Sequence, residues 1–425
     1  MSCTWTPVDK HALTSSEEII HVKNEIKRLE ELLSGVGSMA PVSQKTIQAM
    51  ERKVIEYKAW VAPIRKLPVE LLSAIFTECS RDNWQAPTTI EFVCRYWRRV
   101  VQDTPRAWSF ISFQDPVFPP IISKYVRHGR NMPLHVWARR YYWFAPSGIE
   151  HFTERVHCLR TNLADSLLRH EYPNLNRLFL DVHCQPIGSP VMDENFLHSS
   201  RFPKLQHLSL SCEFLFCYPR IVLAPDLPLV QHLELAIGSY RPWRRIINEF
   251  SKSLRSIRLQ VDDRQRDTGA TDTIYMPLLE YLVVSDRRKD VWELQLGFEA
   301  PELQCYQHVA DADSQRLPAT DVRSIQTLLL TMSVDLTFFP RLRNVTFLRS
   351  FPPVYEVVAA LHACPELCPD LSELVYTAPP EDPSQLHHAQ VMLEERQGMT
   401  SRPIRFSQRN KSRMPQFVQC EVRIQ

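Results

Sequence analysis

Residues 203–210 read PKLQHLSL, a proline followed by the pattern Leu205-x-x-Leu208-x-Leu210. Two leucines two positions apart point to the same face of a strand, and the leucine three positions earlier turns the chain into that strand. A strand with one apolar face cannot bury that face alone, so it needs neighbours of the same kind. This segment therefore predicts one unit of a stacked array of strands.

The same pattern recurs along residues 120–380. Further copies begin at Leu175, Val230, Leu254, Leu279, Leu303 (a degraded copy), Ile325, Leu342 and Leu371. The steps between starting positions are 30, 25, 24, 25, 24, 22, 17 and 29 residues, and most of them fit the ~20–29-residue period of a leucine-rich repeat. The step of 17 before Leu342 is too short for a full repeat and predicts a plain hairpin, with its turn near Phe339 and Pro340. The expected fold is therefore α/β, with an irregular, horseshoe-like leucine-rich-repeat solenoid; a generic α/β domain with short leucine-rich strands is the alternative.

The residues between the buried leucines are expected on the concave face of this array. They mix both signs of charge, hydroxyls and aromatic rings, which suits recognition of a protein but indicates no particular one. The strip as a whole is the candidate substrate site, with simple solvation as the alternative for any single member. Its candidate residues are Arg177, Phe179, His207, Ser209, His232, Glu234, Arg258 and Tyr281.

A second informative segment is PIRKLPVELLSAIFTEC, residues 63–79. Proline is tolerated in the first turn of a helix, where its missing N–H costs nothing. Leu71, Leu72, Ile75 and Phe76 then form one apolar face. Another amphipathic stretch, TTIEFVCRYWRRVV, follows at residues 88–101 and is closed by DTPRAW at 103–108. Helices this short have too little core of their own, and exposed apolar surface of this kind marks an interaction site.

The order L-P-x-E-L-L-x-x-I-F, then V-C-R-x-W-R, then T-P-x-x-W resembles the F-box, in the form common among large fungal F-box families, over about residues 64–108. The resemblance implies a three-helix module that docks onto a Skp-family adaptor, which bridges to a cullin–RING ubiquitin ligase. The polar loop at residues 80–88 departs from the family because it lacks the usual leucine-rich middle helix. An ordinary helical hairpin with a chance Leu-Pro start is the alternative. The residues that the resemblance assigns to the adaptor interface or to the core beneath it are Leu67, Pro68, Leu71, Leu72, Ile75, Phe76, Val93, Cys94, Trp97 and Val100.

The chain is expected to divide into four parts. Residues 1–62 hold two helices, near 14–34 and 43–60, and residues 63–110 hold the F-box. The repeat array follows at 120–380, and residues 381–425 hold a capping helix, near 384–397, and a basic tail. The first helix has one apolar seam of about two heptads, which either packs on its own chain or forms a short coiled coil that dimerises the protein.

The composition excludes several classes of protein. The chain has 425 residues, 44% of them hydrophobic and 23% charged, with a formal net charge of only +2. These values are typical of a soluble globular protein of two or three folding units and not of an electrostatic nucleic-acid binder. No apolar stretch is long enough for a membrane span, and no basic segment precedes an apolar core at the start. The eleven scattered cysteines predict reduced thiols, no metal site and a location in the cytoplasm or the nucleus.

No motif of an enzyme is present. The chain lacks the phosphate-cradling glycine loops, the zinc-protease helix and the nucleophile elbow. The expected function is therefore non-catalytic and needs no cofactor. The resemblance to the F-box implies a substrate-recognition subunit of an SCF-type ligase that binds an unknown protein substrate, with a non-ligase F-box scaffold as the alternative. A nucleic-acid-associated role, resting on the aromatic cluster at 137–144 and the basic residues of 402–425, is less favoured, because such features more often pack or are solvated.

Overall fold

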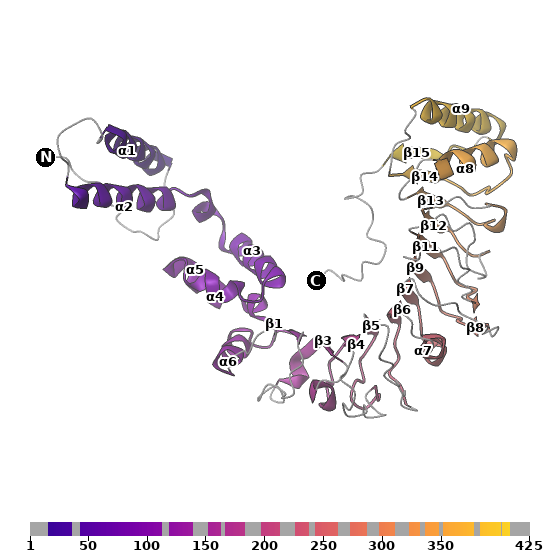
Figure 1. The fold of residues 1–425 in the computed structure, drawn as a ribbon, viewed down its shortest axis with the longest axis horizontal. Coiled ribbons are helices and arrows are strands. Elements are labelled where there is room, and N and C mark those ends of the chain that lie inside the picture. The colour runs from indigo at the N-terminus through magenta and orange to yellow at the C-terminus, as the bar shows by residue number, and fades with distance from the viewer. Residues whose placement is uncertain are drawn as a thin grey trace. The chain divides into compact units, whose positions relative to one another are not determined.

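The computed structural model describes residues 16–35, 43–112, 119–138, 152–162, 166–182, 197–212, 226–237, 243–261, 273–286, 297–310, 323–331, 336–347, 352–377, 383–400 and 402–408. The chain divides into two compact units (Figure 1). The first comprises residues 1–111 and 120–132, and the second comprises residues 112–119 and 133–425. No helix in these described ranges is both long and apolar enough to cross a membrane.

The first unit is helical. Its elements are α1 (Ser16–Gly35), α2 (Gln44–Trp60), η1 (Pro63–Lys66), α3 (Val69–Asp82), α4 (Ala86–Glu91), α5 (Arg95–Gln102), η2 (Pro105–Trp108) and α6 (Pro119–His128). The seam of α1 packs against α2 in one buried cluster that includes Val22, Ile26, Tyr57 and Trp60. The seam predicted from the sequence is therefore covered by the chain's own second helix.

Helices α3 to α6 share a second core. Leu72, Phe76 and Trp108 are at most 1% exposed, and the Trp108 indole N–H donates to the carbonyl of Val101 at 2.7 Å. Helix α6 joins this core through Tyr125, whose ring meets the Trp108 ring edge-on at 5.0 Å. Helices α3, α4 and α5 thus share their core with α6, which begins where the repeat array was expected to begin.

The stretch 88–101 forms two helices and not the single one its pattern suggested. The chain is extended at Cys94 (φ −160°, ψ 169°), and the Cys94 Sγ accepts a hydrogen bond from the Trp97 N–H at 3.4 Å, which caps the start of α5. Helix α4 begins within the polar stretch 80–88, in which no leucine-rich pattern had predicted a middle helix. Its start is favoured by Pro87 in the first turn, where a missing N–H costs nothing.

The second unit is built on a large open parallel sheet. Among the described residues, thirteen strands lie in the order β1-β2-β3-β4-β5-β6-β7-β9-β11-β12-β13-β14-β15, and β8 pairs with β10 in a separate two-stranded sheet. The first two residues of β1 belong to the first unit. Every neighbouring pair from β2 to β15 is parallel. The strands are β1 (Phe110–Ser112), β2 (Leu134–Trp137), β3 (Val156–Asn162), β4 (Arg177–Val182), β5 (His207–Cys212), β6 (His232–Ile237), β7 (Ser256–Val261), β8 (Ile274–Tyr275), β9 (Tyr281–Asp286), β10 (Phe298–Glu299), β11 (Cys305–Ala310), β12 (Thr327–Leu330), β13 (Asn344–Phe347), β14 (Glu373–Tyr376) and β15 (Arg405–Gln408).

The core of this unit is a ladder of apolar side chains. Leu178, Leu208, Leu233, Ile257 and Leu282 are successive register partners and are at most 2% exposed. Each is the second leucine position of a repeat, so the period-two pattern placed them on the buried face. The chain between strands runs through short helical pieces, namely η4 (Thr153–Arg155), η5 (Ser166–Arg169), α7 (Trp243–Phe250), η6 (Leu336–Phe338), α8 (Pro352–Ala363) and α9 (Pro383–Thr400).

The hairpin predicted before Leu342 was wrong. Strands β12 and β13 pair in parallel, with Thr327 opposite Asn344. The described part of the connection before β13 includes a 3₁₀ turn, η6, and the side chains of Leu336 and Phe339 are buried there.

The C-terminal region also differs from the pattern. Helix α9 does not close the array, because β15 follows it and pairs in parallel with β14. Phe406 of β15 packs its ring 5.1 Å from that of Tyr376, which accounts for order at the start of the expected basic tail. Residues 409–425 and the aromatic and arginine residues at 139–144 lie outside the described residues.

Candidate functional site

The four apolar residues predicted on one face of α3 divide into two pairs. Leu72 and Phe76 are 0% and 1% exposed and belong to the core, whereas Leu71 and Ile75 are 51% and 40% exposed. Residues four apart lie one above the other on a helix, so each pair keeps to its own side. Helix α3 therefore anchors itself with one pair and presents the other.

More apolar side chains are exposed on the neighbouring elements. Phe92 and Val93, in the turn between α4 and α5, are 80% and 56% exposed, and Val69 at the start of α3 is exposed as well. We call Val69, Leu71, Ile75, Phe92 and Val93 the docking residues. Large apolar side chains exposed on neighbouring elements are candidates for an interaction site.

The other residues predicted for the adaptor interface lie beside or beneath the docking residues. Pro68 is exposed, Leu67 and Cys94 are half-buried, and Val100 is enclosed in the core. Trp97 is half-buried, with its ring centroid 5.2 Å from that of Phe76. Val69 and Phe92 were not among the predicted residues. Phe92 does not lie on the apolar face of a single helix and is exposed by the break between α4 and α5.

A buried polar network holds this break in place. Glu91 is 5% exposed and forms an ion pair with Lys124 of α6. Its carboxylate accepts a hydrogen bond from Gln102 Nε2 at 2.8 Å, and its backbone carbonyl accepts one from Arg98 Nε at 2.9 Å. The end of α4 is therefore bonded to both α5 and α6, which fixes the turn that holds Phe92 and Val93.

The residues predicted for the concave strip are brought together on the sheet. In register, Arg177, His207, His232, Ser256 and Tyr281 form one row across β4, β5, β6, β7 and β9. A second row consists of Phe179, Ser209, Glu234 and Arg258.

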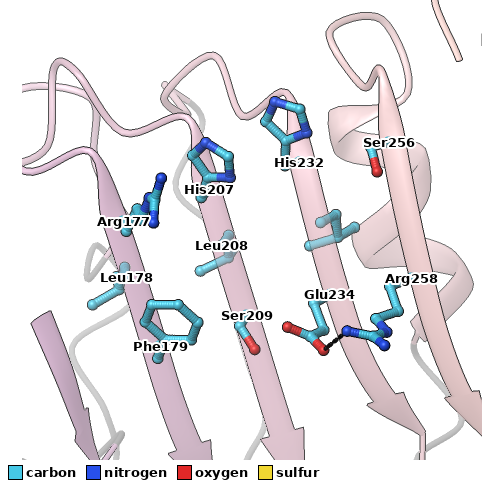
Figure 2. A pocket seen from close by; sticks show the side chains of 11 residues that line it. Arg177, Leu178, Phe179, His207, Leu208, Ser209, His232, Glu234, Ser256 and Arg258 are labelled. Atoms are coloured by element: carbon cyan, nitrogen blue, oxygen red, sulfur yellow. Dashed lines mark ion pairs between the residues drawn. The ribbon is translucent and has the colours of Figure 1, made fainter. Parts of the chain in front are cut away.

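Side chains of both rows, from β4 to β7, line a shallow pocket of about 430 Å³, part of which is open solvent (Figure 2). Ser209 is the small residue of its row, with the larger Phe179 and Glu234 on the neighbouring strands (Figure 2). Tyr281 lies in the upper row beyond the pocket and is not among its lining residues. The pocket therefore contains every predicted strip residue except Tyr281.

Two histidines dominate the upper row of the pocket. The rings of His207 and His232 are stacked, with centroids 4.2 Å apart and planes 9° from parallel. Burial, His232 and Arg177 together lower the pKa of His207 to about 3. Burial, Arg177 and Arg255 lower the pKa of His232, while Glu280 acts in the opposite direction. Both imidazoles are therefore neutral near pH 7, chiefly because burial disfavours the charged form, with repulsion by Arg177 in addition.

Ion pairs occupy part of the strip. Arg258 Nη1 lies 3.5 Å from Glu234 Oε1, and Arg160 Nε donates to Asp181 Oδ2 at 3.1 Å on the adjoining strands. Among the described residues, no group of three or more histidines, cysteines or acidic residues is arranged to hold a metal ion. Burial raises the pKa of the Cys305 thiol to about 12 and that of Cys368 to about 11, which leaves both thiols protonated and poor nucleophiles.

No model of a known protein family matches the chain, and no curated protein is significantly similar to it. Function has to be inferred from the residues that the two units present.

Proposed function

We propose that this chain is the substrate-recognition subunit of an SCF-type cullin–RING ubiquitin ligase. In this proposal α3, α4 and α5 are an F-box that docks onto a Skp-family adaptor, and the parallel sheet is a leucine-rich-repeat solenoid of the horseshoe type that holds a protein substrate. The chain would act in the cytoplasm or the nucleus, without a cofactor, and would contribute proximity between substrate and ubiquitin-charged enzyme rather than chemistry of its own.

One observation carries the proposal: Leu71 and Ile75 are exposed beside the buried Leu72 and Phe76 of the same helix. A helix that served only its own unit would gain by burying all four or by carrying polar residues at the outer positions. The outer pair instead remains available to a partner, as the resemblance of residues 64–108 to the F-box requires.

The test is the double variant Leu71→Asp, Ile75→Asp in the full chain, assayed by capture of a purified Skp-family adaptor. Adaptor capture should be abolished, because two carboxylates would have to leave water to enter the interface. Thermal unfolding should be nearly unchanged, since both positions are already exposed. The matched control is Ile55→Asp, which alters a 67% exposed isoleucine on α2 and should leave capture intact.

If the double variant captures the adaptor as well as the unmodified chain does, the assignment of the interface is wrong. A second measurement separates the ligase from an F-box scaffold that binds the adaptor alone. The ligase requires that a cullin co-purify with the chain and the adaptor, and recovery of the adaptor without cullin favours the scaffold.

A further inference from the structure

The pocket on β4–β7 has an unequal distribution of charge. Its lining includes two arginines, Arg177 and Arg258, and the two stacked histidines, but only one acidic residue, Glu234. Glu234 is already paired with Arg258. With both imidazoles neutral, the lining carries a net charge of +1, and every protonation of a histidine makes it more positive.

We propose that this pocket binds one anionic group of the substrate, a carboxylate or a phosphate, between Arg177 and the pair formed by His207 and His232. The proposal rests on the proposed function of the sheet as a substrate-binding surface and adds the chemical class of what it binds. A guanidinium donates several N–H groups in a planar fork that suits carboxylate and phosphate oxygens. The hydroxyls of Ser209 and Ser256 and the imidazole N–H groups add neutral donors.

One polar atom of the pocket lacks a hydrogen-bond partner among the described residues. The Nδ1 atom of His232 is enclosed and forms no hydrogen bond in the described part of the chain. Buried polar atoms in native proteins nearly always have a hydrogen-bond partner, so an enclosed nitrogen without one indicates that a partner is missing. An anion held at the histidine pair would supply an acceptor close to this ring.

One of the two rows loses its charged residues beyond β7. The row that holds Glu234 and Arg258 continues along β9, β11, β12, β13 and β14 with uncharged residues only: Val283, Gln307, Leu329, Thr346 and Val375.

An anion at this position would change the titration of the histidines. In the free pocket, burial together with Arg177 lowers the pKa of both, and Arg255 and Glu280 act on His232 with opposite signs. A negative charge in contact with both rings favours the imidazolium form and so raises both pKa values. Binding elsewhere on the sheet would not move them together.

The experiment uses the full chain labelled at histidine and follows the imidazole resonances by NMR while inorganic phosphate or acetate is added. We expect phosphate to perturb His207 and His232 saturably and to raise their pKa values. Arg177→Gln should weaken this binding at least tenfold. The matched control Arg405→Gln removes an arginine from the same row at the far strand β15 and should leave the affinity unchanged.

The outcomes separate the possible ligands and the two proposals. Binding of phosphate alone indicates a phosphorylated side chain, and comparable binding of acetate indicates an acidic side chain. The pocket proposal is overturned if neither anion perturbs the two histidines, or if Arg177→Gln and Arg405→Gln bind phosphate equally well. Adaptor capture is measured on the same variants. If the chain captures the adaptor but does not bind the anion, only the pocket proposal is refuted. If the unmodified chain does not capture the adaptor, the ligase proposal is refuted independently of the pocket.

Discussion

Phe92 offers the sharpest test of the docking residues, because it is the most exposed of them at 80%. Complete burial of a phenylalanine side chain is worth about 1.5–3 kcal/mol. Covering the exposed four-fifths of this ring with an adaptor should therefore contribute about 2 kcal/mol. Since 1.4 kcal/mol corresponds to a tenfold change in Kd, we expect Phe92→Ala to weaken adaptor binding about thirtyfold.

The same substitution should hardly affect folding. A ring that is mostly in water contributes little to its own core, so the free energy of unfolding should change by no more than about 0.5 kcal/mol. Phe76→Ala is the opposite case: this ring is 1% exposed, and its removal should cost about 3–5 kcal/mol of stability. The contrast between these two phenylalanines separates an interface residue from a core residue.

Calorimetric titration with a purified Skp-family adaptor measures the Kd, and urea unfolding measures stability. Ile55→Ala serves as the control, because it truncates another exposed apolar side chain of the same unit and should leave the Kd unchanged. The reasoning fails if Phe92→Ala binds within twofold of the unmodified chain. It also fails if this variant loses more than about 1 kcal/mol of stability, since the ring would then be covered by the chain itself.

Two further expectations concern stability. Lys124→Met should destabilise the N-terminal unit by about 3 kcal/mol, because the enclosed carboxylate of Glu91 loses its ion pair. In urea unfolding, the double variant Glu91→Gln, Lys124→Met should recover part of the lost stability. An unchanged urea midpoint for Lys124→Met alone contradicts this prediction. The pKa of His207 is lowered to about 3, so between pH 6.5 and pH 3 the unfolded chain binds a proton at this histidine that the folded chain does not. The free energy of unfolding therefore decreases as the pH is lowered through this range. Replacing His207 with Gln should reduce this loss between pH 7 and 5 by about 1 kcal/mol, allowing for partial exposure, and equal losses in both proteins rule it out.

The strand positions were predictable because a strand has a period of two. Leu205-x-x-Leu208-x-Leu210 places two leucines on one face whatever surrounds it. Strand β5 begins at His207, within this pattern, and Leu208 lies in the buried ladder. The interleaved residues His207 and Ser209 consequently fall on the opposite face, so most of the pocket's lining was contained in the same pattern.

Other features depend on contacts that no local pattern records. The break between α4 and α5 requires the extended backbone at Cys94 and is supported by Lys124, which lies in a different helix. Strand β15 depends on packing between Phe406 and Tyr376. The stacking of His207 on His232 arises because their strands pair in register, and spacing along the chain does not indicate which repeats will be neighbours or how their rings will lie.

The division of α3 into a buried and an exposed pair has a counterpart on strands β4 to β7, which line the pocket. Leu72 and Leu71 are adjacent in sequence, as are Leu208 and Ser209, and in each pair the first residue is in the core while the second is at least partly exposed. Substituting the first should therefore lower stability, and substituting the second should alter binding with little effect on folding. The two candidate surfaces also belong to different compact units. Leu71→Asp, Ile75→Asp should consequently abolish adaptor capture and leave phosphate binding intact, while Arg177→Gln should do the reverse; a variant that loses both functions while still folded would mean that the two surfaces are not independent.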